Sequence, residues 1–179
     1  MARIPYVEKS NLPADQQDLQ LHQNFQRAYA NSPKALRAFT SLSGYVREKS
    51  PLDPKLRELA ILQVGYATDC PYAFTHHVKV GLAAGLSPDE IRAIKDDAAG
   101  RPTKFGPVEK AVLQAARDLT AGTPVSDATY GTLQRTLGNE QLMDLLFVTV
   151  HYVGMARLLL TLQVDIEDDY AKYLKDYPL

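Results

Sequence analysis

The sequence predicts an all-α fold, a single-domain helical bundle, and three observations predict it. No stretch alternates apolar and polar residues as a half-buried strand does. Apolar residues instead recur at every third or fourth position, as on the buried face of a helix. A capping side chain followed by proline, a common helix start, occurs at Ser32-Pro33, Asp53-Pro54 and Ser87-Pro88. With 179 residues, 45% of them hydrophobic, the chain can bury a sizeable core.

The N-terminal part is expected to begin irregularly and then to become helical. Residues 1–14 carry two prolines and few periodic apolar positions, so we expect an extended arm that lies on a partner surface. A helix is predicted over about 15–29. The next helix runs from Ser32-Pro33 to about residue 48, and its buried stripe is formed by Leu36, Phe39, Leu42 and Tyr45.

The middle of the chain predicts three consecutive helices. Asp53 caps a helix to about residue 67, and its centre is apolar on nearly all sides, as in a central buried helix. The chain restarts at Asp69-Cys70-Pro71 and stays helical to about residue 84, where Gly85 is a typical C-terminal stop. A complete capping box, Ser87-Pro88-Asp89-Glu90, begins a short helix to about residue 97.

The C-terminal part predicts further helices and no second domain. The loop at 98–106 is too short to separate independent domains, so we expect one domain over residues 1–179. The tail from Asp165 is acidic and then aromatic. The helices predicted between the loop and the tail span about 107–121, 126–137 and 139–162.

Composition excludes several classes of function. The formal net charge is −1, so no basic surplus is present for binding nucleic acid. Charged and polar residues interrupt the longest apolar stretch, near 142–162, and the N-terminus lacks the pattern of a signal peptide, so no membrane span is expected. A single cysteine cannot form an internal disulfide, which favours a reducing compartment, and we expect a cytoplasmic protein.

The chemistry-bearing residues gather between Glu58 and His77. Cys70 lies at a helix start, where free backbone N–H groups lower the pKa of a thiol, although the neighbouring Asp69 opposes this effect. His77 shares a face with Cys70 but lies two turns away, roughly 10 Å along the axis. Antiparallel packing of the two helices could instead bring Glu58 beside His77, as a carboxylate that orients a general base. Glu58 as an exposed first-turn residue is the equally weighted alternative.

The remaining polar candidates have ordinary explanations as well. Adjacent histidines cannot both point inward, so His76 or His77 is expected at the surface. No HExxH or Cys/His spacing is present, so neither a metal nor another cofactor is expected. His151 lies in an apolar helix and is expected to be structural rather than pocket-lining, and Tyr72 is a further candidate for the pocket wall.

The segment resembles the carboxymuconolactone decarboxylase and alkylhydroperoxidase D-like superfamily. In its peroxidase branch a glutamate precedes a Cys-x-x-Cys pair by twelve positions, and a histidine follows the second cysteine by four. Glu58, Cys70 and His77 match three of these positions, whereas Ala73 stands where the second cysteine would be. The resemblance implies an all-helical bundle of the alkylhydroperoxidase D-like type, assembled as a homo-oligomeric trimer or hexamer.

The replacement at Ala73 disfavours dithiol peroxidase chemistry and leaves three hypotheses. The first, which we prefer, is acid/base chemistry on a small carboxylate or lactone-type compound, with His77 moving the proton, Glu58 orienting it, and Tyr72 or Cys70 lining the pocket. The second is a single-cysteine alkyl hydroperoxide reductase, in which Cys70 is oxidised to a sulfenic acid that an external thiol reduces. The third is a non-catalytic helical assembly.

Overall fold

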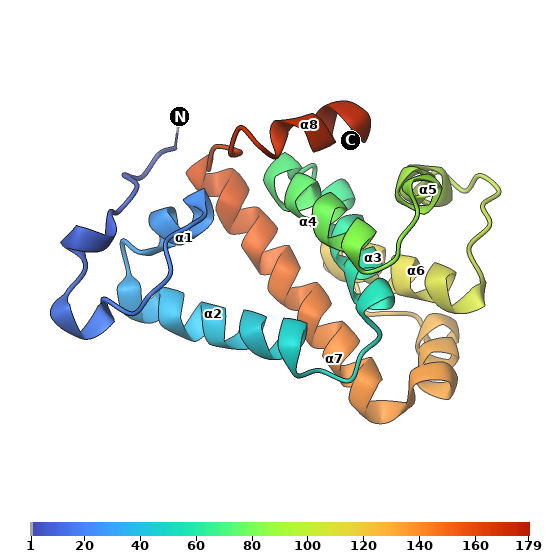
Figure 1. Ribbon diagram of the computed structural model, residues 1–179. Coiled ribbons are helices and arrows are strands. Elements are labelled where there is room, and N and C mark those ends of the chain that lie inside the picture. The colour runs from blue at the N-terminus through green and yellow to red at the C-terminus, as the bar shows by residue number, and fades with distance from the viewer. Residues whose placement is uncertain (1) are drawn as a thin grey trace.

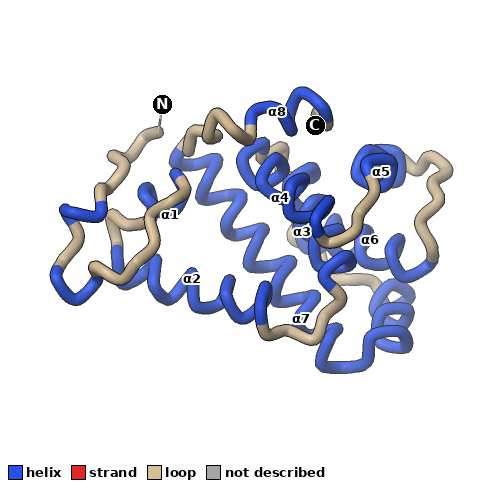
Figure 2. Tube along the Cα trace, viewed as in Figure 1, coloured by secondary structure: helices blue, strands red, loops and turns tan. Residues whose placement is uncertain are grey.

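The computed structural model describes residues 2–179, and they form an all-α fold, which confirms the predicted class. No strand occurs in this part of the chain (Figure 2). The α-helices are α1 (Asn24–Tyr29), α2 (Pro33–Glu48), α3 (Pro54–Ala67), α4 (Pro71–Ala83), α5 (Pro88–Ala98), α6 (Pro107–Ala121), α7 (Asp127–Leu162) and α8 (Ala171–Asp176).

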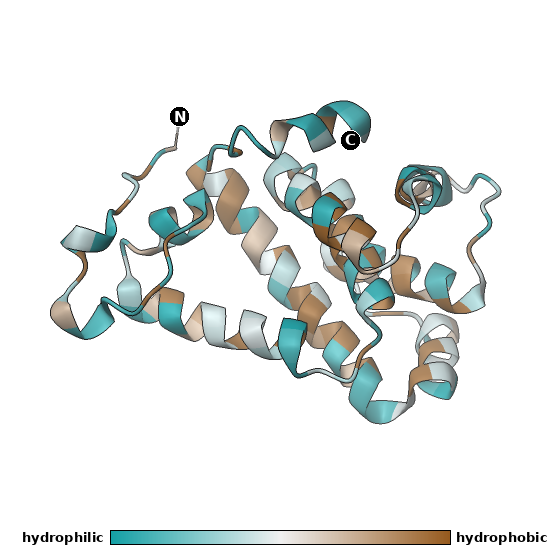
Figure 3. Cartoon of the chain, viewed as in Figure 1, coloured by the Kyte–Doolittle hydropathy of each residue, from teal (hydrophilic) through white to brown (hydrophobic). Residues whose placement is uncertain are grey.

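Helix α3 is the centre of the bundle. It packs against α4, α6 and α7, and every residue from Arg57 to Gly65 is buried (Figure 1). Its charge-poor sequence matches this position, because a helix surrounded by other helices has no solvent face. The helices packed around α3 contain many hydrophobic residues, whereas α5 and α8 consist mostly of hydrophilic residues (Figure 3).

Helices α3 and α4 form a tight antiparallel hairpin that sets the position of the site. The connection turns at Asp69, which has a left-handed φ of 49°. Gly65 then allows the backbones to approach, because a Cβ there would lie 3.1 Å from backbone atoms of Phe74. At the other end, a Cβ on Gly81 would lie 3.0 Å from Leu86 and 3.7 Å from Glu58. The hairpin thus places the start of α3 beside the second half of α4.

The helix predicted over 15–29 is wrong in its first half. Only α1 is α-helical, and it is preceded by short 3₁₀ turns at Lys9–Asn11 and Ala14–Gln16. This stretch has no continuous apolar stripe for a helix to bury. Its buried residue Leu19 and the hydrogen bonds from Arg37 to Gln16 and Asp18 hold it as an irregular segment against α2.

The N-terminal arm meets the segment that follows α7. The amide of Arg3 donates to the carbonyl of Leu162, and the hydroxyl of Tyr6 donates to Asp165 at 2.9 Å. The arm predicted over 1–14 is therefore tied to the C-terminal end of α7 in its own chain. The short helix α8, which the sequence analysis did not predict, follows this junction and crosses over α4 (Figure 1).

Helix α7 bends at Gly138, where φ is 72° and ψ is 178°. The bend coincides with the predicted boundary between helices at 126–137 and 139–162. By length and composition alone α7 could also cross a membrane, with 39% of its most apolar window buried, a test that core helices pass as well. Within the bundle, α7 packs against α3 and α6, and its Asp144 accepts a hydrogen bond from Ser50 at 2.5 Å.

Candidate functional site

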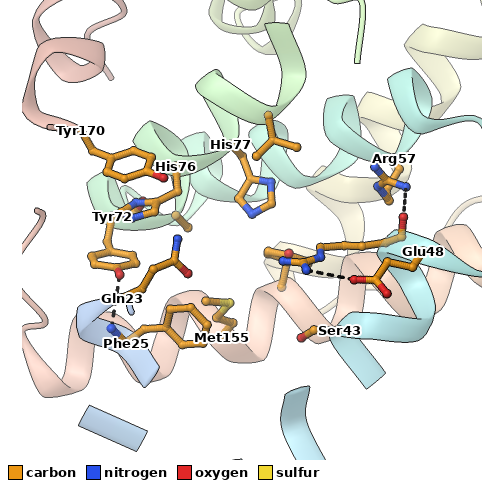
Figure 4. Close-up of a pocket in the computed structure, with 14 residues that line it drawn as sticks. Gln23, Phe25, Ser43, Glu48, Arg57, Tyr72, His76, His77, Met155 and Tyr170 are labelled. Carbon is orange, nitrogen blue, oxygen red and sulfur yellow. Dashed lines mark hydrogen bonds and ion pairs between the residues drawn. The ribbon is translucent and has the colours of Figure 1, made fainter. Parts of the chain in front are cut away.

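A cavity of about 340 Å³ opens where α1, α2, α4 and α7 converge (Figure 4). One half of its wall is aromatic or apolar and includes Phe25 and Met155, whereas Arg57 and Glu48 lie on the opposite side with His77 between the halves. The complete lining consists of Gln23, Phe25, Ser43, Arg47, Glu48, Arg57, Tyr72, Ala73, His76, His77, Val80, Tyr152, Met155 and Tyr170.

The hairpin of α3 and α4 joins Glu58 and His77 at this cavity. The Nδ1–H group of His77 donates to Oε2 of Glu58 over 2.6 Å. Glu58 is fully buried and His77 is 8% exposed. An ionised carboxylate can only accept, so the proton of a neutral imidazole lies on Nδ1 and the lone pair lies on Nε2. The Nε2 atom has no hydrogen-bond partner among residues 2–179, and His77 points into the cavity (Figure 4).

His77 and Arg57 together keep the buried Glu58 ionised. The Nε–H group of Arg57 donates to the second carboxylate oxygen, Oε1, at 3.0 Å, and its Nη1 donates to the carbonyl oxygen of Arg47. Burial alone would raise the pKa of Glu58, but the charge and hydrogen bond of His77 and the hydrogen bond of Arg57 outweigh it and lower this pKa. The expectation of an exposed Glu58 is therefore wrong, and the glutamate belongs to a three-residue network.

Cys70 does not belong to this network of Arg57, Glu58 and His77. It is the N-terminal cap of α4, it has no exposed surface, and it does not line the cavity. Burial raises the pKa of its thiol, and the N–H groups of Ala73 and Tyr72 lower it too little to compensate. The expected activation of Cys70 by the helix start is thus outweighed by burial. Ala73, the position of the missing second cysteine, is the one that faces the cavity.

His76 is buried as well, which corrects the expectation that one of the two histidines lies at the surface. Only 7% of it is exposed, and its ring stacks between Tyr72 and Tyr170 at centroid distances of 4.2 and 3.8 Å. Its Nδ1 lies 2.9 Å from the carbonyl oxygen of Tyr72, and its Nε2 lies 2.9 Å from Glu167. The C-terminal segment supplies Glu167 and Tyr170, so it closes this side of the cavity.

The two predicted pocket residues occupy different places. Tyr72 lines the cavity, and its hydroxyl donates to Glu167 at 2.8 Å. His151 is outside the lining, half-buried against the ring of Phe39, and bonds through Nε2 to the hydroxyl of Ser43 at 2.7 Å. Burial lowers the pKa of His151, which favours its neutral form. The preference for a structural role of His151 agrees with this position.

Sequence analysis missed four residues that complete the site: Arg57, Tyr152, Glu167 and Tyr170. Arg57 directly precedes Glu58, and an arginine beside a buried glutamate is the one sequence signal available. The other three come from α7 and the tail, and no local pattern connects them with α4. Among residues 2–179 no group of three His, Cys, Asp or Glu side chains is arranged to hold a metal ion.

Comparison with known proteins places these observations in a family. The sequence model of the Carboxymuconolactone decarboxylase family matches residues 33–118, which include Glu58, Cys70 and His77. No curated protein matches the chain.

Solved structures share the fold over nearly the whole chain. A peroxidase-related protein with an alkylhydroperoxidase AhpD core, from Ralstonia eutropha JMP134, is 20% identical, with a TM-score of 0.76 over 97% of this chain and 95% of that one. The debrominase Bmp8 is 14% identical, with a TM-score of 0.81 over 98% and 97%. A peroxidase-related protein from Silicibacter sp. TM1040 is 20% identical, with a TM-score of 0.73 over 94% and 92%. At these identities the likeness establishes the fold and not the reaction.

Proposed function

This chain belongs to the carboxymuconolactone decarboxylase and alkylhydroperoxidase D-like superfamily, and from that premise we propose that it is an acid/base enzyme. Its substrate is a small carboxylate or lactone-type compound, and His77 moves the proton. The observation that carries this proposal is the His77–Glu58 pair, in which Nδ1 is held at 2.6 Å by a buried carboxylate while Nε2 faces the cavity.

The proposed step is proton transfer at a carbon next to a carbonyl group. Nε2 of His77 takes the proton, the C–H electron pair forms a carbon–carbon double bond, and the carbonyl oxygen becomes an enolate. Glu58 stabilises the imidazolium that forms, and Arg57 holds the carboxylate in place. Return of the proton from Nε2 to a different carbon of the enolate system completes an isomerisation. In a decarboxylation the C–C electron pair left by departing carbon dioxide forms the enolate instead, and a His77 that carries a proton on Nε2 then delivers it to carbon.

The alternatives have less support from the same geometry. A single-cysteine peroxidase needs a thiolate that a hydroperoxide and then an external thiol can reach, but Cys70 is fully buried and its pKa is raised. A non-catalytic assembly has no use for a buried acid–base pair whose free nitrogen opens into a cavity. Bmp8, a structural neighbour, is a debrominase that has been crystallised with 2,3,4-tribromopyrrole, so this fold can hold a small ring.

The test is turnover of a panel of lactones and cyclic carboxylates in deuterated water, with deuterium incorporation and carbon dioxide release as readouts. We expect His77→Asn to lower turnover by about 10²–10⁴-fold and Glu58→Gln to lower it less. The exposed histidine supplies the matched control, His22→Asn, which is expected to keep full activity. Undiminished turnover in both site variants would contradict the proposal. Hydroperoxide consumption that disappears in Cys70→Ser would instead establish the peroxidase.

We also propose that the protein is a homo-oligomer, a trimer or hexamer, in the cytoplasm, without nucleic-acid or membrane partners. An exposed apolar stripe on α7 supports the assembly, and it contains Met143, Phe147, Val150 and Leu158, each 42–55% exposed. In sedimentation equilibrium, Phe147→Glu is expected to lower the mass, whereas the polar control Arg135→Glu on the same helix is not. A monomeric wild-type protein would contradict this proposal.

A further inference from the structure

Tyr152 is a buried tyrosine at the cavity wall whose hydroxyl has no hydrogen-bond partner in the described part of the chain. It lies on α7, is 5% exposed and lines the cavity, and its ring meets that of His77 edge-on at a centroid distance of 4.7 Å. The other tyrosine hydroxyls buried nearby are bonded, that of Tyr72 to Glu167 and that of Tyr29 to the carbonyl of Met155. No hydrogen bond of the Tyr152 hydroxyl occurs among residues 2–179. A hydroxyl donor left open at a cavity wall is available to a ligand atom.

Charged groups of both signs act on the Tyr152 hydroxyl. Burial raises the pKa of Tyr152 most, the Glu58 carboxylate raises it further, and the guanidinium groups of Arg47 and Arg57 lower it. The net result is a pKa above its ordinary value, so Tyr152 remains a hydrogen-bond donor at neutral pH.

Of the two arginines, Arg47 is the one available to a ligand. Arg57 is 7% exposed and already bonds Glu58 and the Arg47 carbonyl. Arg47 lines the cavity with a side chain that is 54% exposed, and its single ion pair, to the adjacent Glu48, is long at 3.4 Å. Such an exposed pair contributes little, so a carboxylate or enolate oxygen can displace it.

We propose that the Tyr152 hydroxyl and the Arg47 guanidinium form an oxyanion subsite beside His77 that binds a carboxylate or enolate oxygen of the substrate. The proposal rests on the proposed function, because the enolate oxygen exists only if His77 removes a proton from the neighbouring carbon. In that step Tyr152 keeps its proton and donates a hydrogen bond to the new oxyanion, and Arg47 balances its charge. Both residues are therefore catalytic residues rather than structural ones.

The shape of the cavity adds a preference for a flat ring. Phe25, Met155, Tyr72 and Tyr170 lie together on the side away from Arg57 and Glu48 (Figure 4). A ring packed against this apolar side would direct an attached carboxylate toward the arginines. Benzoate has this layout, and benzamide is a neutral molecule of nearly the same shape, so the two form a matched pair of probes.

The test is isothermal titration of both probes into wild-type and variant protein. We expect Tyr152→Phe to weaken benzoate binding by about fivefold and Arg47→Gln by about tenfold, with benzamide binding changed by less than about twofold. The matched controls are Tyr130→Phe and Arg135→Gln, both at exposed positions of α7, and they are expected to bind benzoate as the wild type does.

The same titrations separate this proposal from the proposed function. His77→Asn is expected to lose turnover while still binding benzoate, so failure of the acid/base chemistry leaves the subsite measurable. Benzoate binding that is absent in the wild type, equal in all variants, or lost together with benzamide binding overturns the subsite. Should Tyr152→Phe fail to fold, as its thermal midpoint would reveal, Arg47→Gln decides alone, because its half-exposed side chain is not part of the core.

Discussion

His76 and His77 are neighbours on α4, and each places a ring nitrogen close to a carboxylate, at 2.9 Å from Glu167 and at 2.6 Å from Glu58. In His76 both ring nitrogens lie near acceptors, Nδ1 at 2.9 Å from the carbonyl oxygen of Tyr72 and Nε2 at 2.9 Å from the carboxylate of Glu167. In His77 only Nδ1 is engaged, and Nε2 faces the cavity. His76 therefore forms part of the cavity wall, whereas the neighbouring His77 has a ring nitrogen that a substrate can reach.

The difference between the two pairs comes from what surrounds each carboxylate. Glu58 lies on the central helix α3 and is fully buried beside Arg57. Glu167 lies on the C-terminal segment, with 19% of its side chain exposed, and also accepts from Tyr72 and the backbone of Asn24. The buried Glu58 leaves Nε2 of His77 free to act as a base. The more exposed Glu167 instead connects the C-terminal segment to α4 through His76, and we call this Glu167–His76 contact the clasp.

The largest expected effect distinguishes the two carboxylates by stability. Glu58→Ala leaves the buried charge of Arg57 unpaired and is expected to reduce the free energy of unfolding by about 3–5 kcal/mol. Glu167→Ala removes a partly exposed clasp and is expected to cost roughly 1–2 kcal/mol. Urea unfolding at neutral pH measures both, and equal losses would contradict the contrast between a central and a peripheral pair.

A second prediction concerns the protons themselves. Long-range ¹H–¹⁵N spectra should show a proton on Nδ1 of both histidines, because Nδ1 of His76 faces the carbonyl oxygen of Tyr72 and Nδ1 of His77 faces the Glu58 carboxylate. The variants His76→Asn and His77→Asn assign the signals. A His77 ring with its only proton on Nε2 would contradict the hydrogen bond to Glu58.

The clasp should also make stability depend on pH in the acid range. The hydrogen bonds of His76, Asn24 and Tyr72 overcome burial and lower the pKa of Glu167 to about 2, from 4.5 for the free group. A lowered folded pKa means that the contribution is complete above about 4.5 and is lost as the pH falls toward 2.

The measurement for this pH dependence is the unfolding free energy between pH 6 and pH 3. Glu167→Gln is expected to lose about 1 kcal/mol less stability over that range than the wild type does. Glu140→Gln, at an exposed position of α7, is the matched control and should follow the wild type. Parallel curves for all three proteins would mean that the clasp is absent.

The smallest expected effect concerns Cys70, whose thiol is buried at the start of α4. Because its thiol is fully buried with a raised pKa, iodoacetamide should alkylate the native protein at least about tenfold more slowly than the unfolded protein. Cys70→Ala is expected to change proton-transfer activity by less than about twofold. Fast alkylation in the folded state would show that the Cys70 thiol is accessible and would support the peroxidase hypothesis.

The sequence by itself predicted most of the helices and the hairpin that builds the site. Pro33, Pro54 and Pro88 with their preceding caps predicted the starts of α2, α3 and α5, because capping and proline geometry are local properties. Gly138 likewise predicted the break in α7. The apolar centre of α3 indicated a buried helix, and from this the pairing of Glu58 with His77 could be proposed as one of two alternatives.

Only the tertiary structure decided which side chains reach the cavity and which are buried away from it. Burial of Cys70 reverses the effect that its helix start predicts, since desolvation depends on neighbours from the whole bundle. His76 turns inward only because Glu167 and Tyr170 arrive from the tail, nearly a hundred positions along the chain. Tyr152 reaches the cavity from α7 in the same way. Spacing along one helix cannot reveal such partners, because packing between distant segments selects them.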